Sequence, residues 1–335
     1  MASRLCFDMS DRVTYLEAEG DGEGCLVVRW HLEEPGAVDI STGLTPLSED
    51  HTPVLRVEAG TEVARLSGLS PGRHYVSVAR CSGGAALVGA ERRLPFEGVR
   101  NFRDLGGYPT VEGTRVRWGT VYRSDGLHQM TQADLLAFKM TGVRVVYDLR
   151  GTAERSEHPG PVEPIAIELV SSAPGEDRLA LGSGATRLDA ERLLRDVYVG
   201  MLVNSAPLFG QLFSGLTIPE HLPAVFHCAG GKDRTGMAAV LLLSALGVAR
   251  EVVLDDYQLT QRWRTVADEP ELFHILVGSG VPEEAATAFL GAPRWAMADA
   301  LKAVDDVCGG IAAYLRGPAG MGGRSVAALP SLLTA

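Results

Sequence analysis

Short runs in which hydrophobic and polar residues alternate dominate the first part of the chain. The runs are Cys25–Trp30, Ala37–Ile40, Val54–Val57, Glu62–Leu66 and His74–Ala79. Turn-forming stretches separate them, among them E-E-P-G, L-S-G-L-S-P-G-R and C-S-G-G, and no helical period interrupts the pattern. Many short strands at this spacing predict a small all-β sandwich domain over residues 1–95.

From about Glu97 the pattern changes to strands that alternate with helices. Thr131 is a predicted N-cap, with Asp134 at the third helical position. We expect strands at Val116–Tyr122, Val143–Leu149, Ile165–Val170 and Ala224–His227. We expect helices at Thr131–Met140, 189–204, 206–215 and Arg234–Leu246. The chain after them is predicted to be helical to about Leu315, with breaks at Gly278–Val281 and Gly291–Pro293. This alternation predicts an α/β domain over residues 96–317, with helices around a central, mostly parallel sheet.

Two segments rich in small residues are predicted to lack regular structure. Residues 171–187, rich in Ser, Ala and Gly, have the composition of a flexible loop or lid. The tail, residues 318–335, begins within G-P-A-G-M-G-G-R-S and is predicted to be partly loose.

A glycine-rich turn joins an apolar strand to an apolar helix in A-V-F-H-C-A-G-G-K-D-R-T-G, residues 224–236. Cys228 lies at the carboxyl end of the strand, where ligands bind in open α/β folds. The backbone N–H groups of such a turn converge on an anion, and Gly230 and Gly231 allow the tight fold. Because the same field stabilises a thiolate, we expect Cys228 to be largely ionised near neutral pH.

Arg234 and Thr235 add to this arrangement. Arg234 can direct two N–H donors at two phosphoryl oxygens, which a lysine cannot do, and Thr235 can donate its hydroxyl to the sulfur. Together the residues predict phosphate-monoester hydrolysis in two steps, in which the Cys228 thiolate attacks phosphorus and water then releases phosphate. The loop N–H groups and Arg234 would stabilise the equatorial oxygens, where charge gathers.

Composition narrows the class of protein. The net charge of −11 opposes a broad nucleic-acid or anionic-membrane surface. The N-terminus has no apolar core of a signal peptide, and the longest apolar run, Met237–Leu246, is too short to span a bilayer. The five cysteines include no C-x-x-C pair, which favours reduced thiols over a disulfide framework or zinc site. We therefore expect a cytoplasmic protein with no metal, no other cofactor and no integral membrane segment.

The turn also carries a family resemblance. H-C-A-G-G-K-D-R-T-G resembles the phosphate-binding loop of cysteine-dependent protein tyrosine phosphatases, and its Gly-Lys-Asp-Arg-Thr form is similar to a bacterial atypical branch that includes secreted mycobacterial and listerial tyrosine and lipid phosphatases. Further matches are V-R-N-F-R-D-L-G-G-Y (99–108), V-Y-R-S-D (121–125), V-V-Y-D-L-R (145–150) and D-D-Y-Q-L-T (255–260). The first domain resembles a fibronectin type III-like domain, with L-V-V-R-W as its second strand and the core tryptophan.

The resemblance implies a role for each residue of the turn. Cys228 would be the nucleophile and Arg234 the phosphate clamp. The substrate phosphate would be bound by Ala229, Gly230, Gly231, Lys232, Asp233, Arg234 and Thr235. Lys232 resembles a lysine that adds positive charge in enzymes acting on phospholipid headgroups or multiply phosphorylated substrates; the alternative is a solvated surface lysine.

Two carboxylates compete for the role of the acid that protonates the leaving oxygen. The Trp-Pro-Asp loop of the best-known tyrosine phosphatases is absent from the sequence. Asp148, in the D-L-R match at the end of its strand, is the first choice. Asp233, inside the turn, is the second, and could instead orient water or tune Cys228. For either residue the alternative is a structural cap or an ion pair with Arg150.

Other polar residues in the matches are expected to support the site. Arg103 and Asp104 would brace it through hydrogen bonds, and Arg123 could reach phosphate or, equally, form an ion pair. We expect Tyr257 to pack behind the turn and His227 to hold the backbone of the turn.

The leading function is therefore a phosphatase of the protein tyrosine phosphatase type, acting on a phosphorylated protein. A small-molecule phosphate ester or a phosphoinositide is the alternative substrate, the latter weakened by the acidic charge. A catalytically dead phosphate-binding module is a second alternative, which the intact pair Cys228 and Arg234 opposes. Arg234 and the lack of a C-x-x-C partner disfavour a thiol redox or sulfur-transfer enzyme. The pattern sets no oligomeric state.

Overall fold

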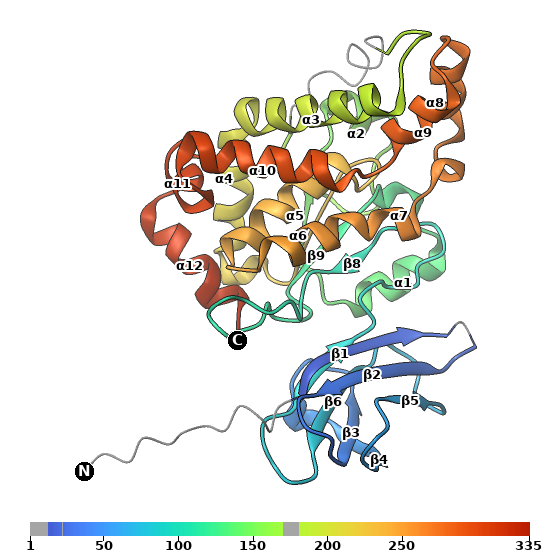
Figure 1. The fold of residues 1–335 in the computed structure, drawn as a ribbon, viewed down its shortest axis with the longest axis vertical. Helices are drawn as coiled ribbons and strands as arrows, with labels where there is room; N and C mark the ends of the chain where they lie inside the picture. Colours follow the sequence, from blue (N-terminus) through green and yellow to red (C-terminus); the bar gives the residue numbers. More distant parts are fainter. Residues whose placement is uncertain (1–12, 22, 170–180) are drawn as a thin grey trace. The chain divides into compact units, whose positions relative to one another are not determined.

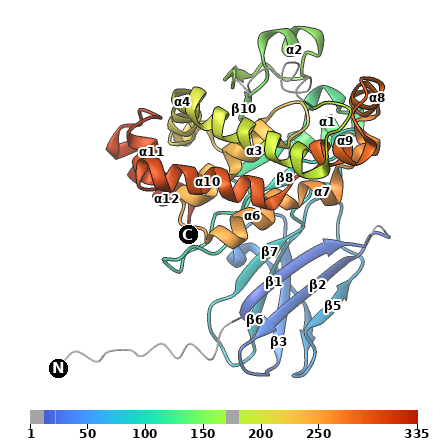
Figure 2. The same ribbon diagram turned by 45° about the horizontal axis from the view of Figure 1, so that its top comes forward.

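The computed structural model describes residues 13–21, 23–169 and 181–335, and the chain divides into two compact units, Met1–Leu94 and Pro95–Ala335 (Figures 1 and 2). Most of the loop or lid expected at 171–187 lies outside the described residues. Its last residues lead into a helix that Thr186 caps.

The smaller unit consists of two antiparallel sheets in its described part. One has the strand order β1-β2-β5, with β1 (Val13–Gly20), β2 (Leu26–Leu32) and β5 (Val63–Leu66). The other has the order β4-β3-β6-β7, with β4 (Thr52–Val57), β3 (Val38–Gly43), β6 (Tyr75–Arg80) and β7 (Leu87–Ala90). A 3-10 turn, Ser48–Asp50, precedes β4. The five expected runs coincide with β2 to β6.

Both sheets contribute side chains to one hydrophobic core. In β2 the buried positions alternate, and Trp30 is 2% exposed, against Val38 and Val78 from the other sheet, which are fully buried. Strands β1 and β7 were not anticipated. In β1 only Val13 and Ala18 are buried, so its pairing with β2, rather than its own hydrophobicity, makes it a strand.

The larger unit is built on a five-stranded sheet with the order β11-β10-β12-β9-β8. Its strands are β11 (Ile165–Ala166), β10 (Val145–Asp148), β12 (Ala224–His227), β9 (Val121–Ser124) and β8 (Arg103–Asp104). All neighbours pair in parallel except β8 and β9. The register places Asp148 opposite His227 and His227 opposite Ser124, so the carboxyl ends of β10, β12 and β9 are level at one edge.

Helices surround this sheet. They are α1 (Gln132–Met140), α2 (Thr152–Glu157), α3 (Arg187–Asn204), α4 (Ala206–Leu216), α5 (Asp233–Ala245), α6 (Arg250–Gln258), α7 (Thr260–Trp263), α8 (Pro270–Gly278), α9 (Glu283–Leu290), α10 (Arg294–Cys308), α11 (Ile311–Arg316) and α12 (Gly323–Leu333). Three-residue 3-10 turns lie at Leu127–Gln129, Pro219–His221 and Val266–Asp268. The predicted breaks fall between α8 and α9 and between α9 and α10.

Helix α5 lies at the centre of the unit. Every residue from Thr235 to Leu243 is buried, as expected for a helix that packs on all sides. It contacts β12 and β9, α3 and α6 pack against it, and α10 joins α3 to α6 (Figure 1). The predicted cap of α1 is confirmed, because the Thr131 side chain accepts from the Asp134 N–H at 3.1 Å and the reciprocal bond is present.

Three strand predictions were too long, and the one at Val143–Leu149 is regular over Val145–Asp148. The strand expected at Val116–Tyr122 begins only at Val121, because Val116 pairs instead with Thr334. The strand expected at Ile165–Val170 is regular over Ile165–Ala166, and Val170 lies outside the described residues.

The prediction of a loose tail is wrong over its last part. Helix α12 buries Leu329 and Leu333 completely in the core of the larger unit. After it, the Arg115 N–H donates to the Ala335 carbonyl and the Ala335 N–H donates to the Arg115 carbonyl, both at 2.8 Å. The glycines before the helix suggested flexibility, but the apolar residues after them have a core surface to cover.

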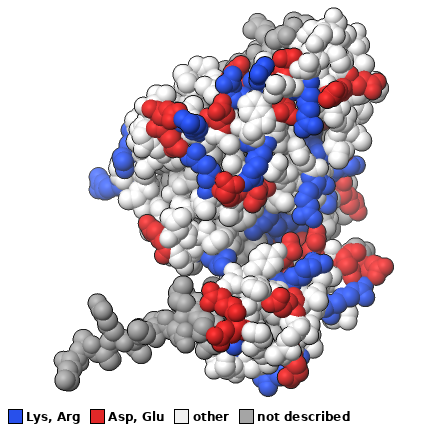
Figure 3. All heavy atoms as spheres, in the orientation of Figure 1, with Lys and Arg blue, Asp and Glu red and all other residues white. Residues whose placement is uncertain are grey.

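Charges on the face of the larger unit that carries α3 and α10 intermingle (Figure 3). The pair Arg195–Asp299 joins the two helices at 3.2 Å. Among the helices within the described ranges, none has both the length and the hydropathy needed to cross a bilayer.

The tail helix should contribute measurably to stability. We expect Leu329→Ala to lower the free energy of unfolding by about 2–5 kcal/mol, because it removes a fully buried side chain and leaves a cavity. Leu136→Ala on α1 is the matched control, since that leucine is 66% exposed and its loss should cost less than about 0.5 kcal/mol. Urea denaturation of the full chain measures both. Equal, small effects would show that α12 does not contribute to the core as described.

Candidate active site

The candidate site is the turn between β12 and α5, here called the cysteine loop, Cys228–Arg234. It begins at the sheet edge where β10, β12 and β9 end level, and it runs directly into the first turn of α5. Cys228 is buried, with 3% of its surface exposed. The sequence prediction placed the strand, the turn and the helix here, and their bounds agree with it to within a residue.

Gly231 is the loop position that only glycine can occupy without strain. Its φ is +65°, a left-handed conformation that other residues rarely adopt. A Cβ there would lie 2.7 Å from the backbone nitrogen of Asp125 and 2.8 Å from the Asn101 side-chain nitrogen. The loop therefore packs directly on the segments that follow β9 and precede β8.

Donors outside the loop hold its carbonyl groups. The Arg123 guanidinium donates to the Gly231 carbonyl at 2.8 Å, and the Asn101 amide donates to the same oxygen at 3.1 Å. The Gly126 N–H donates to the Ala229 carbonyl at 2.8 Å. The Ala229 and Gly231 carbonyls are therefore held by partners outside the loop, and a loop that binds an anion through its N–H groups needs its carbonyls held in this way.

A buried charge cluster fixes these donors. Asp256 on α6 accepts from Arg123 at 2.8 Å and from Arg103 at 3.2 Å, and all three side chains are at most 1% exposed. Burial lowers the pKa of Arg123 to about 10, with the neighbouring Arg103 adding to the effect, so Arg123 stays charged at neutral pH. Arg123 thus forms an ion pair beneath the loop, and the expectation that it contacts phosphate is not supported by its position.

Arg103 contacts the cluster beneath the loop, whereas the Asp104 carboxylate holds the backbone of the segment that follows β8. Arg103 also donates to the Asp256 carbonyl at 2.9 Å, and its guanidinium lies 5.4 Å from the centre of the Trp263 ring. The Asp104 carboxylate accepts from the N–H groups of Gly106 at 2.7 Å and Gly119 at 2.8 Å.

Arg234 is held by a carboxylate that the sequence analysis did not single out. Its two terminal nitrogens donate to Glu154 at 2.6 and 2.8 Å. Burial opposes the charge of Arg234, but these bonds and the nearby negative groups raise its pKa above the ordinary value. Burial would also raise the pKa of Glu154, but the bonds from Arg234 hold it below its usual range. Among the described residues two of the five guanidinium N–H groups are used, which leaves three for a bound anion.

Asp148 forms an ion pair with Arg150. Both carboxylate oxygens accept from Arg150, the shortest contact being 2.7 Å, and the side chain is 2% exposed. Burial opposes ionisation, but the bonds from Arg150 lower the pKa of Asp148. His227 Nε2 lies 3.6 Å from it, and burial lowers the pKa of His227 to about 4, so the ring is neutral near pH 7. His227 Nδ1 is 3.1 Å from the Cys228 carbonyl, in keeping with a role in holding the loop backbone.

Asp233, the other carboxylate considered, is held differently. It is the first residue of α5, and its side chain is 34% exposed. The Tyr198 hydroxyl donates to its Oδ1 at 2.7 Å, and the Tyr198 and Tyr257 hydroxyls are 2.7 Å apart. The Tyr257 ring lies behind the loop as expected, 3.2 Å from where a Cβ of Gly236 would be.

The side chain of Lys232 has neither of the two environments considered from the sequence. Its ammonium group donates to the carbonyls of Phe289 at 2.9 Å and Gly291 at 2.8 Å, and it lies 3.3 Å from Asp233 Oδ1. Among the described residues two of its three N–H donors are used by carbonyl groups, and Asp233 is its ion-pair partner. Lys232 therefore fixes the cysteine loop to the C-terminal end of α9.

Thr235 also differs from its predicted role. It is fully buried, and its hydroxyl donates to the Ser124 carbonyl at 3.4 Å. The side chain thus joins α5 to the end of β9, and the predicted hydrogen bond to sulfur is absent among the described residues.

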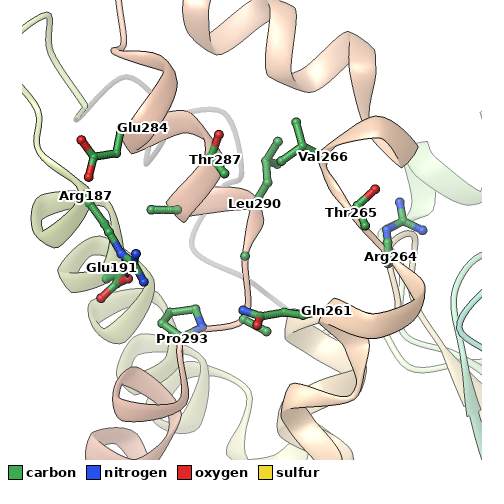
Figure 4. Close-up of a pocket in the computed structure, with 13 residues that line it drawn as sticks. Arg187, Glu191, Gln261, Arg264, Thr265, Val266, Glu284, Thr287, Leu290 and Pro293 are labelled. Carbon is green, nitrogen blue, oxygen red and sulfur yellow. Dashed lines mark hydrogen bonds and ion pairs between the residues drawn. The ribbon is translucent and has the colours of Figure 1, made fainter.

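A hollow of about 410 Å³ adjoins the loop (Figure 4). Arg187, Glu191 and Glu284 lie on one side of it, and Arg264 lies on the other (Figure 4). Gly291, which accepts from Lys232, belongs to its wall.

Arg264 connects the hollow to the cysteine loop. Its guanidinium pairs with Glu269 at 2.8 Å and with the buried Asp125 at 3.3 Å, and its Nε would be 3.5 Å from a Cβ of Gly230. Burial would lower the pKa of Arg264, but Glu269 and Asp125 raise it. Burial raises the pKa of Asp125, although Arg264 and the N–H groups of Arg100 and Asn101 oppose the shift. Within the described residues no group of His, Cys, Asp or Glu side chains is arranged to hold a metal ion.

Comparison with known proteins identifies the family. A model described as the tyrosine phosphatase family matches residues 94–335, which is more than half of the chain.

The chain belongs to the tyrosine phosphatase family.

Relatives of this tyrosine phosphatase agree with the assignment. A Cupriavidus necator protein named as a candidate tyrosine-protein phosphatase is 31% identical over 236 residues, covering 69% of this chain and 86% of that protein. A tyrosine-protein phosphatase of Nostoc commune is 28% identical over 46% of this chain and 53% of its own length. The triple specificity protein phosphatase PtpB of Mycobacterium tuberculosis is 28% identical over 50% of this chain and 68% of its own. The protein is a phosphoric monoester hydrolase.

The buried charge cluster of this phosphatase should be essential to its stability. We expect Asp256→Asn to lower the free energy of unfolding by about 3–5 kcal/mol, because it leaves Arg103 and Arg123 buried without a counter-charge. Asp255→Asn is the matched control: its side chain is 67% exposed and pairs with Arg294, so its loss should cost about 1 kcal/mol or less. Chemical denaturation measures both, and similar values for the two variants would contradict the cluster's role.

Proposed function

We propose that the protein hydrolyses phosphotyrosyl groups of proteins through a cysteinyl-phosphate at Cys228. The observation that carries the proposal is the cysteine loop itself. The carbonyls of Ala229 and Gly231 are bound from outside by Arg123, Asn101 and Gly126, and Arg234 ends the loop with three N–H donors that have no partner among the described residues. Such preorganised donors stabilise charge that develops on a transferring phosphoryl group.

In the first step the Cys228 thiolate forms a bond to phosphorus, and the bond from phosphorus to the tyrosyl oxygen breaks. That oxygen keeps the electron pair and takes a proton from the carboxyl group of Asp233. In the second step a water molecule gives a proton back to Asp233 and attacks phosphorus, the S–P bond breaks, and the sulfur leaves as a thiolate. Inorganic phosphate is released and the site returns to its starting state.

We assign the proton donor to Asp233 rather than to Asp148, reversing the order of the sequence prediction. Both oxygens of Asp148 accept from Arg150, and this pairing lowers the pKa of Asp148, so it favours the carboxylate form and opposes protonation. Asp233 lies in the loop, is partly exposed, and has contacts on Oδ1 alone among the described residues. Its Oδ2 can therefore carry a proton toward a bound ester.

The environment of Lys232 supports a phosphotyrosyl substrate over a phosphoinositide or another multiply phosphorylated ester. A second phosphate needs a free cation near the first. The ammonium group of Lys232 is bound by two carbonyls, its charge is paired with Asp233, and its side chain is only 9% exposed, so it is not a free cation. The hollow that Arg264 and Gly291 line next to the loop is the proposed binding place for the residues around the phosphotyrosine.

We further propose that the smaller unit is a fibronectin type III-like domain. Its sheets of three and four strands, its buried Trp30 on β2 and its buried Tyr75 on β6 support this proposal. Arg73 lies over the Tyr75 ring at 4.8 Å and donates to its hydroxyl at 2.9 Å.

Loss of the nucleophile tests the mechanism. We expect Cys228→Ser to lower turnover of a phosphotyrosyl peptide at least about ten-thousandfold, since a serine hydroxyl is a far weaker nucleophile, while inorganic phosphate still binds. Cys308→Ser, at the end of α10, is the matched control and should retain full activity. Rapid quench followed by mass spectrometry should find phosphate on Cys228 of the wild type. Undiminished turnover of Cys228→Ser would refute the proposal, and faster hydrolysis of an inositol phosphate or sugar phosphate than of the peptide would refute the substrate class.

The ion pair behind Arg234 offers an independent test. We expect Glu154→Gln to lower kcat/KM about tenfold, equal to about 1.4 kcal/mol, because Arg234 loses the charge that fixes its orientation. The glutamine can still accept the Gly151 N–H at the start of α2, so the helix is retained. Glu157→Gln on the same helix is exposed and should leave kcat/KM unchanged. Equal kcat/KM for both variants would show that Glu154 does not position Arg234.

A further inference from the structure

Behind Asp233 lies a buried chain of hydroxyl groups that the proposed mechanism has not used. The Tyr198 hydroxyl, on α3, is 2.7 Å from Asp233 Oδ1 and 2.7 Å from the hydroxyl of Tyr257, on α6. Both tyrosines are fully buried, and their rings meet edge to face with centroids 6.2 Å apart. Three helices, α3, α5 and α6, thus meet at the side chain of one carboxylate.

The proton positions in this chain follow from the number of donors. A tyrosine has one hydroxyl proton, and Tyr198 donates its proton to Asp233 Oδ1. The proton between the two hydroxyls must therefore come from Tyr257. Burial and the nearby charge of Asp233 raise the pKa of both tyrosines, so both stay protonated throughout the working pH range.

The chain of hydroxyl groups also makes the two carboxylate oxygens of Asp233 different from each other in their contacts. Tyr198 and Lys232 both approach Oδ1, the lysine at 3.3 Å, and within the described residues Oδ2 accepts no hydrogen bond. A carboxylic acid whose Oδ1 is bound by donors carries its proton on Oδ2.

We propose that Tyr198, supported by Tyr257, is the positioning residue for the proton donor of this phosphatase. This inference rests on the proposed function, in which Asp233 is the general acid. As the Oδ2–H bond breaks and the proton passes to the leaving oxygen, negative charge develops on the carboxylate. The hydrogen bond from Tyr198 to Oδ1 then becomes charge-assisted and strengthens, so it favours proton transfer in addition to fixing the orientation of the carboxyl group.

The position of Asp233 explains why such support matters. The residue opens α5 with its side chain about one third exposed, and a short side chain there can turn toward solvent. A catalytic acid must stay within hydrogen-bond reach of the oxygen that it protonates, and small displacements cost large factors in rate. The hydrogen bond from Tyr198, on α3, restrains the Asp233 side chain in this way.

The test is the dependence of kcat/KM on the leaving group. Aryl phosphates from dinitrophenyl phosphate, whose phenol leaves without a proton, to phenyl phosphate, whose phenol needs one, are compared in the full chain. We expect Tyr198→Phe to lower kcat/KM about tenfold or more for phenyl phosphate and to change it little for dinitrophenyl phosphate, because general acid catalysis contributes about 10²–10⁴-fold where protonation is needed. Tyr257→Phe should act in the same direction and more weakly.

Two comparisons separate positioning from a merely structural role. Tyr314→Phe removes another buried hydroxyl, which donates to the Leu202 carbonyl at 2.7 Å, and should leave the leaving-group dependence as in the wild type. In the double variant Tyr198→Phe with Asp233→Asn, the tyrosine substitution should add nothing to the leaving-group dependence of Asp233→Asn alone, because the acid it positions is already lost.

Several results would overturn the inference. A loss that is equal for all leaving groups assigns Tyr198 a structural role. An additive effect in the double variant shows that Tyr198 does not act through Asp233. If Asp233→Asn leaves the leaving-group dependence unchanged, Asp233 is not the acid and the inference fails, while the nucleophilic role of Cys228 stands on its own trapping experiment. If circular dichroism shows Tyr198→Phe to be unfolded, Tyr257→Phe decides by the same criterion.

Discussion

The conformation of the site depends on the ion pairs that the Asp256 carboxylate forms with Arg103 and Arg123. Two arginines, Arg103 and Arg123, are fully buried beneath the cysteine loop, and a buried guanidinium without a counter-charge is strongly unfavourable. Because Asp256 pairs with both guanidinium groups, Arg123 can stay buried and donate to the Gly231 carbonyl. The conformation of the cysteine loop thus depends on an ion cluster that lies outside the loop as well as on its own seven residues.

Three of the carboxylates near the loop, Glu154, Asp148 and Asp233, are distinguished by their partners. Glu154 and Asp148 each face an arginine with both oxygens, which lowers their pKa values and keeps them ionised. Asp233 is bound on Oδ1 only, by a neutral hydroxyl and beside an ammonium group. Of the three, it is the carboxyl group whose second oxygen is open to a proton. The pairing of each carboxylate is therefore the basis on which we propose different roles for Glu154, Asp148 and Asp233.

The sequence predicted what depends on neighbouring residues and missed what depends on distant ones. The strand, turn and helix around Cys228, and the cap at Thr131, follow from local patterns, and the structure has them at the predicted places. Glu154, Tyr198 and Arg264 were missed, because each contacts the site from a separate element and carries no motif of its own. The tail was misread for a related reason: its glycines are a local signal of flexibility, while the core surface that Leu329 and Leu333 cover is assembled from distant segments. The hydroxyl of Tyr198, on the buried side of α3, is a polar atom that must find a partner, and this was the available signal.

Lys232 shows that a residue type at a matching motif position need not have the role that the family resemblance implies. The family resemblance makes it a cation for lipid headgroups or additional phosphates, whereas here it donates to the carbonyls of Phe289 and Gly291 and forms an ion pair with Asp233. Hydrogen bonds from an ammonium group to carbonyls are strong, so the segment between α9 and α10 cannot move away from the loop without breaking two of them. That segment is also a wall of the hollow beside the loop. The cysteine loop and the wall of the adjacent hollow are therefore coupled, because a displacement of Gly291 would break a hydrogen bond to Lys232 of the loop.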